Sequence, residues 1–166
     1  VFWELAMKKS DSPEMQEVFQ AQKAEANTEF FKYVSKNYAS WVNPKSTDGP
    51  VMSHTMLKFK VLPHVQKGTP LFFVLIDNLR FDQWKMIQPI FADSFRIQEE
   101  DTFYSILPTA TQYARNAIFS GMMPVDIEKN FPAQWKNDDE EGGKNLHEEE
   151  FFKAQLKRLG KSELKF

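Results

Sequence analysis

Two oxygen-bearing side chains stand at points where this sequence changes character. Asp77 directly follows the apolar run of residues 71–76, and Thr111 follows residues 108–110 (Pro-Thr-Ala) at the start of a helix-forming stretch. A threonine hydroxyl beside a divalent ion can ionise and attack phosphorus, while the free N–H groups at a helix start hold a phosphoryl oxygen. This pair of residues predicts metal-assisted phosphoryl transfer.

Both residues also have a plainer interpretation, because an aspartate after a strand and a threonine before a helix are common helix caps. Position alone leaves the two interpretations open for Asp77 and for Thr111. Their occurrence after two successive strand-like stretches favours a shared site, since ligands bind at the carboxyl ends of strands in open parallel sheets. We expect the carboxylate and the hydroxyl to lie close enough to bind one ion.

The composition is that of a globular protein with a core. The 166 residues are 42% hydrophobic and 27% charged, with a formal net charge of −2, which argues against a general nucleic-acid coat. No apolar run approaches the ~20 residues that span a bilayer, and no signal peptide opens the chain, so we expect a cytoplasmic location. Cysteine is absent, so a metal would be held by oxygen or imidazole. The start at Val1 suggests a piece of a longer protein.

The apolar patterns predict an α/β fold. Residues 71–76 are apolar without alternation, which is typical of a strand buried on both faces of a parallel sheet. Residues 95–106 are interpreted as a broken second strand. Helices are expected at residues 52–66 (capped at Ser53 and disturbed at Pro63), from Asp82 to about Phe91, 111–119, and about 146–159.

The N-terminal part of the chain is predicted to be helical. Residues 11–14 (Asp-Ser-Pro-Glu) form a start signal, and apolar residues then recur at helical spacing until Pro44 and the turn at residues 48–50. Residues 1–7 are interpreted as the tail of a preceding helix, so residues 1–50 would be a helical connector or bundle segment. The apolar stripe of the long helix either packs against a neighbouring helix or binds a partner.

Two motifs carry a family resemblance. Residues 76–82 (IDNLRFD) and 105–115 (SILPTATQYAR) resemble the start of a PglZ domain of the alkaline phosphatase superfamily. With residues 137–143 (NDDEEGG) and the helical segment before them, the chain resembles the PorX-type response regulators. The resemblance implies an alkaline-phosphatase-like sheet with flanking helices, of which residues 51–166 would be the N-terminal part. It further implies zinc-dependent phosphodiesterase or phosphatase activity on phosphoesters, with nucleotides as the expected substrates, in a two-component regulator of type IX secretion.

The resemblance also assigns roles to residues. Asp77 matches a strand-terminal metal ligand, and Thr111 matches a nucleophile that also binds metal. A related branch of the superfamily has Pro-Thr-x-Thr followed at fixed distances by Gly and Pro; here Gly121 and Pro124 stand at those distances, which favours Thr111 over Thr109. Thr109 would then support the turn. The family's phosphate-binding asparagine stays open among four residues, of which the first two are taken as substrate-binding candidates: Asn116, Asn145, Asn130 and Asn137.

The family's further ligand motifs, Asp-x-x-x-His and Asp-His-Gly, are absent from this sequence. The three histidines, at positions 54, 64 and 147, are interpreted as solvated or locally bonded. The remaining ligands of two zinc ions would therefore lie outside this chain, which alone would be inactive.

The partners implied are a receiver domain of the same protein and a phosphodiester or nucleotide substrate, with a second copy, a sigma factor or a sensor kinase as further candidates. The competing hypothesis is a non-catalytic regulatory module that senses a nucleotide and uses residues 13–42 either to dimerise or to contact a sigma factor or a kinase.

Overall fold

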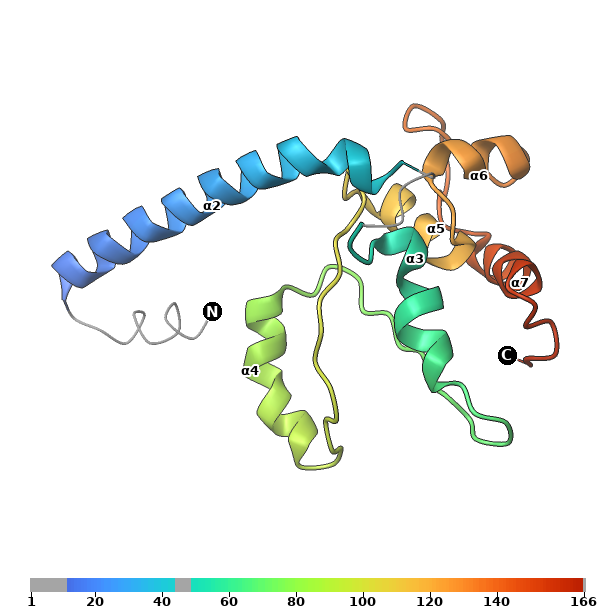
Figure 1. The fold of residues 1–166 in the computed structure, drawn as a ribbon, viewed down its shortest axis with the longest axis horizontal. Helices are drawn as coiled ribbons and strands as arrows, with labels where there is room; N and C mark the ends of the chain where they lie inside the picture. The colour runs from blue at the N-terminus through green and yellow to red at the C-terminus, as the bar shows by residue number, and fades with distance from the viewer. Residues whose placement is uncertain (1–11, 44–48, 166) are drawn as a thin grey trace. The chain divides into compact units, whose positions relative to one another are not determined.

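The computed structural model describes residues 12–43 and 49–165 of the chain. The predicted helix tail at residues 1–7 and Asp11 of the predicted start signal lie outside the described residues. The chain divides into two compact units, Val1–Gly49 with Asn78–Glu100, and Pro50–Asp77 with Asp101–Phe166. Within the described ranges, the regular structure is helical (Figure 1).

The predicted α/β sheet is wrong for the described residues, which contain helices and one isolated β-bridge but no strand. Residues 71–76 are extended, yet no backbone hydrogen bond joins them to another described segment. A parallel strand is stable only when neighbouring strands satisfy its backbone groups. The apolar run indicated a strand but could not show whether partner strands are present.

The extended segment also buries one side rather than two. Phe73 and Leu75 pack against a buried cluster, whereas Phe72 and Val74 are 88% and 74% exposed. The cluster consists of Met56, Leu57 and Ile118. The side chains therefore alternate as in a strand with one covered face.

Residues 95–106, predicted as a broken second strand, are irregular apart from Tyr104. Tyr104 forms a parallel bridge with Met52: its N–H donates to the carbonyl of Val51 (2.9 Å), and its carbonyl accepts from the N–H of Ser53 (3.0 Å). The hydroxyl of buried Ser53 accepts a hydrogen bond from the N–H of Ile106 (3.1 Å). This crossing fixes the backbone that leads into the next helix.

Helix α2, Pro13–Trp41, confirms the predicted long helix. The N–H of Met15 donates to the hydroxyl of Ser12, and Pro13 occupies the first turn, as the start signal predicts. No residue of α2 is buried, and its apolar residues Phe30 and Phe31 are exposed. The apolar stripe is therefore only partly covered: Phe19, Val34, Tyr38 and Trp41 are half-buried.

Helix α4, Phe81–Ala92, confirms the helix predicted from Asp82 to about Phe91. Three of its side chains donate hydrogen bonds to the carboxylate of Glu100: Trp84, Lys85 and Gln88. The chain that follows α4 is thereby tied back to the helix, which explains why residues 78–100 belong to the same compact unit.

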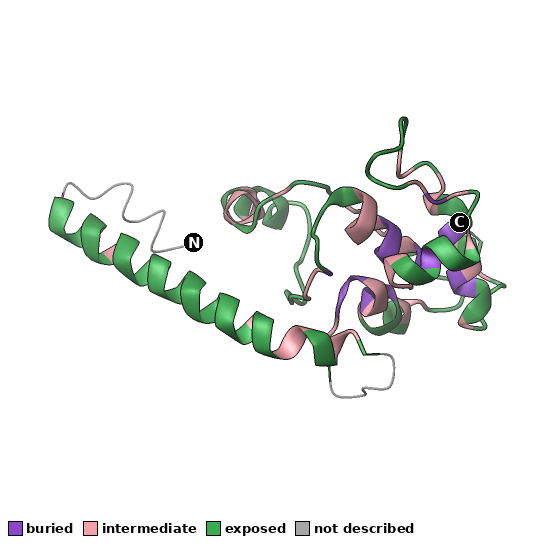
Figure 2. Cartoon of the chain, turned by 90° about the horizontal axis from the view of Figure 1, so that it is seen from above, coloured by how far each residue is buried: buried purple, intermediate pink, exposed green. Residues whose placement is uncertain are grey.

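The second unit is built around α5, Thr111–Ser120, which packs between α3, Ser53–Met56, and α7, Glu148–Arg158. Buried residues gather in these helices (Figure 2). After α3 the chain continues as the π-helix η1, Leu57–Val61, and the 3₁₀-helix η2, Leu62–His64. The predicted cap at Ser53 is wrong, because Met52 is the N-cap and Thr55 supplies the capping hydroxyl.

Helix α6, Pro124–Asn130, was not predicted. Its seven residues are too short for helical periodicity to stand out, although Pro124 at its first turn is a start signal. It carries Ile127 into a second core cluster with Trp135 and Phe151. The predicted ends of α5 and α7 are confirmed within two residues.

The C-terminal ends of α5 and α7 are joined by hydrogen bonds. Gln155 donates to the carbonyl of Ile118 (2.9 Å), and Arg158 donates to the carbonyl of Ser120 (2.5 Å). Gly121 ends α5 in the left-handed region with φ of 62°. A Cβ on Gly121 would lie 2.6 Å from Nε2 of Gln155, so this turn requires glycine for both conformation and space.

Replacing Gly121 with alanine should lower the free energy of unfolding by more than the ~1–2 kcal/mol of backbone strain alone, because Gln155 must also move. Gly160→Ala is the matched control: Gly160 has φ of 69° but open space around its Cβ position. Urea unfolding of both variants measures the difference. Equal losses would show that the contact with Gln155 costs nothing.

Candidate functional site

Thr111 begins α5 at a helix start that no side chain caps. The N-cap is Ala110, whose carbonyl accepts from the N–H groups of Tyr113 and Ala114. The N–H groups of Thr111 and Gln112 have no hydrogen-bond partner in the described part of the chain, nor does the exposed hydroxyl of Thr111. The positive end of the helix dipole therefore carries unpaired donors and a hydroxyl that can meet an anion.

Asp77 ends the extended segment at a turn in which Asn78 takes a positive φ of 58°. Its Oδ2 lies 3.3 Å from Nη1 of Arg115, while Oδ1 has no partner among residues 12–43 and 49–165. The side chain of Asp77 is 44% exposed. One carboxylate oxygen is thus held and the other is available to a ligand.

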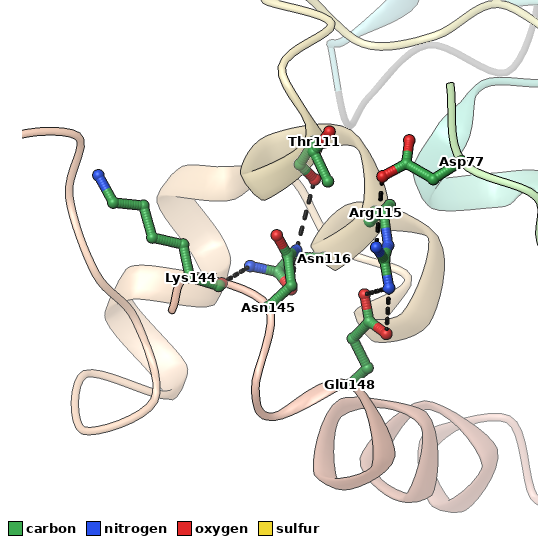
Figure 3. Close-up of polar contacts among 7 residues, drawn as sticks. All are labelled: Asp77, Thr111, Arg115, Asn116, Lys144, Asn145 and Glu148. Atoms are coloured by element: carbon green, nitrogen blue, oxygen red, sulfur yellow. Dashed lines mark hydrogen bonds and ion pairs between the residues drawn. The ribbon is translucent and has the colours of Figure 1, made fainter. Parts of the chain in front are cut away.

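The contact with Arg115 places Asp77 beside the N-terminal half of α5 (Figure 3). Arg115 follows Thr111 by four residues, so the two side chains lie on the same face of the helix, with Cβ atoms about 5–6 Å apart. The structure therefore brings Asp77 and Thr111 to one helix half. A helix face takes the place of the predicted sheet edge.

Glu148, the first residue of α7, is the second partner of Arg115. Nη2 of Arg115 lies 2.7 Å from the Glu148 carboxylate, and that side chain is 19% exposed. The Glu148 carboxylate, and to a smaller extent that of Asp77, raises the pKa of Arg115 above its usual value. Neither Arg115 nor Glu148 was predicted from the sequence as a site residue. The available signal was that Arg115 closes the motif at residues 105–115, one turn after Thr111.

Asn116 and Asn145 form a network with the start of α5 (Figure 3). Asn116, 2% exposed, donates to the carbonyl of Lys144 (2.9 Å) and accepts from the Asn145 amide (3.0 Å). The Asn145 amide also donates to the carbonyl of Thr111 (3.4 Å). These two substrate-binding candidates lie at the site, where Asn116 is buried, Asn145 is half-buried, and both side chains form hydrogen bonds.

The other two asparagine candidates are engaged elsewhere. The Asn130 amide donates to the carbonyl of Asp126 within α6, and the Asn137 side chain accepts from the indole of Trp135. The loop after Asn137 reaches α5 through Asp138, which accepts hydrogen bonds from Gln112 and Tyr113. The acidic loop is thereby held against the first turn of α5.

The predicted turn residue Thr109 is exposed, and its side chain forms no hydrogen bond to the described residues. The structure thus provides no contact by which Thr109 would support the turn. Thr109 remains a nearby hydroxyl against which Thr111 can be compared.

The hydrogen bonds and ion pairs of the described histidines do not involve Asp77. His147 pairs with Glu150 (3.3 Å) and His64 is exposed. Within the described residues, no group of three or more His, Cys, Asp and Glu side chains could hold a metal ion. Asp77 and Thr111 fit a divalent ion in donor type, but two oxygens do not complete a coordination sphere.

His54 on α3 is half-buried, and its Nδ1 has no hydrogen-bond partner in the described ranges. Burial lowers the pKa of His54 below 6.5, although Asp126 acts in the opposite direction. No described helix is both long and apolar enough to cross a membrane.

Comparison with known families gives two matches. Residues 56–163 match the family profile described as the BREX system PglZ alkaline phosphatase-like domain. Residues 1–42 match the profile of the PorX response regulator linker domain. No curated protein matches the chain. The two matches agree with the two parts that the sequence motifs indicate, a PorX-type segment followed by a PglZ domain.

Asn116→Ala should lower the free energy of unfolding by about 1–3 kcal/mol, because the buried Asn116 side chain is lost and the half-buried Lys144 carbonyl and Asn145 amide each lose a hydrogen-bond partner. Asn130→Ala removes an exposed amide and should cost about 0.5 kcal/mol or less. Urea unfolding compares them. Similar losses in both variants would contradict a structural role for the Asn116 network.

Stability should fall as the pH drops below 6.5, because unfolded chains protonate His54 before the folded protein does. His54→Gln should reduce this dependence of the free energy of unfolding on pH. His64→Gln changes an exposed histidine and is the matched control, which should keep the dependence. Urea unfolding at a series of pH values from 7 to 5 checks this. An unchanged slope in His54→Gln would refute the burial effect.

Proposed function

This chain belongs to the PglZ alkaline phosphatase-like family, and from that membership we propose that it carries the nucleophile of a phosphodiesterase. The observation that supports this most is the free hydroxyl of Thr111 at an uncapped helix start, on the helix half that Asp77 contacts through Arg115. A phosphodiester, with nucleotides as the substrate class, is the proposed substrate.

In the proposed reaction, the Thr111 hydroxyl loses its proton and its oxygen attacks phosphorus, while the bond to the leaving alcohol breaks and that alcohol takes up a proton. A covalent threonine phosphodiester forms, in which phosphorus still carries the other ester group. Water then attacks the same phosphorus, releases the phosphomonoester and restores the hydroxyl. The N–H groups of Thr111 and Gln112 are positioned to donate to a non-bridging oxygen as negative charge builds up. The half-buried Asn145 already donates to the carbonyl of Thr111 and to Asn116, so it would donate to another phosphoryl oxygen by giving up one of these two hydrogen bonds.

We propose zinc as the metal cofactor, with Asp77 and Thr111 contributing the donors of this chain. Zinc would lower the pKa of the Thr111 hydroxyl and offset the charge on phosphate. The donor set of the described residues is incomplete. The proposal therefore assigns the remaining ligands of two ions to residues outside these 166.

The linker match extends the proposal to regulation. A PorX-type linker is expected to connect a receiver domain of the same protein to this phosphoesterase-like domain. We propose that the whole protein acts in the cytoplasm as a two-component regulator of type IX secretion. A sensor kinase, a sigma factor or a second copy of the chain would be its protein partners.

A second candidate function is a non-catalytic module that binds nucleotides and partners. The exposed apolar residues of α2, such as Phe30 and Phe31, favour it, because the described chain buries no residue of that helix. A docking module has no use for the unpaired hydroxyl of Thr111. Turnover therefore distinguishes the two candidates.

In the complete protein, Thr111→Ala should reduce hydrolysis of a chromogenic phosphodiester by at least about a thousandfold, because the nucleophile is lost. Thr109→Ala, two residues away and equally exposed, should change the rate by less than about tenfold. Initial rates with and without a zinc chelator measure both effects. Comparable activity in the wild type and Thr111→Ala would eliminate Thr111 as nucleophile.

A wild-type protein that binds nucleotide but shows no turnover, with zinc present, would favour the non-catalytic module. Circular dichroism and thermal unfolding of Thr111→Ala serve as the folding control. The side chain of Thr111 is exposed and unbonded, so its loss should leave the fold intact.

A further inference from the structure

Arg115 contacts two carboxylates that come from different segments of the chain. Nη1 lies 3.3 Å from Oδ2 of Asp77, and Nη2 lies 2.7 Å from the carboxylate of Glu148. Because different nitrogens are used, the guanidinium holds both carboxylates at once (Figure 3). Asp77 follows the extended segment, whereas Glu148 begins α7.

The two contacts are unequal. The contact with Glu148 is shorter, and the Glu148 side chain is 19% exposed, against 44% for Asp77, so water screens it less. Glu148 is also fixed by its helix, since α7 buries Phe151 and Leu156 in the core. The pair of Arg115 and Glu148 is thus the rigid support, and Asp77 is the group that is supported.

We propose that Arg115 is a positioning residue for Asp77, with Glu148 holding Arg115 in place. By donating to Oδ2, Arg115 orients the carboxylate while Oδ1 stays without a partner among the described residues. Carboxylates that bind metal ions are commonly held in this way by a hydrogen bond to their other oxygen. The inference deepens the proposed function and rests on it, because it gives Asp77 the role of metal ligand.

Charge alone predicts the opposite result. Loss of the guanidinium would leave Asp77 and Glu148 without a counter-charge, and a more negative site attracts a divalent cation more strongly. Loss of orientation instead weakens cation binding, because the free carboxylate oxygen is no longer held in place. The sign of the change in zinc affinity therefore distinguishes positioning from simple neutralisation.

The test measures zinc binding by the complete protein, with zinc ions alone as the probe and a chromogenic chelator as competitor. Arg115→Met should weaken zinc binding about tenfold or more, and Arg115→Lys should restore part of the loss. Glu148→Gln, which weakens the support, should weaken binding about threefold. Unchanged or tighter binding in Arg115→Met overturns the proposal.

Asp77→Asn separates this inference from the proposed function. If Asp77→Asn leaves the zinc affinity unchanged, Asp77 is not a ligand and the metal assignment itself fails. If Asp77→Asn lowers the zinc affinity but Arg115→Met does not, only the positioning role of Arg115 fails. Adding Arg115→Met to Asp77→Asn should have no further effect if Arg115 acts through Asp77.

Arg158→Met is the matched control, because Arg158 also contacts α5 but at the carbonyl of Ser120, at the other end of the helix. It should lower the melting temperature and leave zinc affinity unchanged. Should Arg115→Met fail to fold, Arg115→Lys and Glu148→Gln decide the matter. Wild-type zinc affinity in both of these variants would overturn the proposal.

Discussion

The burial of the C-terminal half of α5 is the constraint on which the site depends. Ala117 and Ile118 are packed into the core, and Gln155 and Arg158 bind the last carbonyls of the helix from α7. A helix held so firmly at one end presents its other end at a defined place. The exposed hydroxyl of Thr111 thus stands on a rigid element, although it makes no hydrogen bond with the described residues.

Charge in the site is organised around that helix rather than around a sheet. Arg115 lies on the same face as Thr111 and draws Asp77 and Glu148 toward α5. The two carboxylates outnumber the guanidinium, so the three groups together carry a net negative charge. Such a balance suits a neighbourhood that attracts cations, while the unpaired N–H groups at the start of α5 suit an anion.

The helices were largely predictable from the sequence because their signals are local. Ser12 and Pro13 start α2, and the left-handed turn at Gly121 ends α5; both signals can be recognised within one turn of chain. The sheet prediction failed because a strand depends on partners that residues 71–76 cannot specify by themselves. At the site, residue types predicted Asp77 and Thr111, whereas the role of Glu148 depends on how α7 packs, which no spacing rule reveals.

The extended segment at residues 71–76 has a consequence for handling the protein. It is apolar, uncharged and free of proline, its backbone forms no hydrogen bonds to other described segments, and Phe72 and Val74 face outward. Segments of this kind template the cross-β association of identical chains when nothing covers them. Concentrated solutions of this chain would therefore tend to aggregate through residues 71–76, and a lysine in place of Val74 would protect against it.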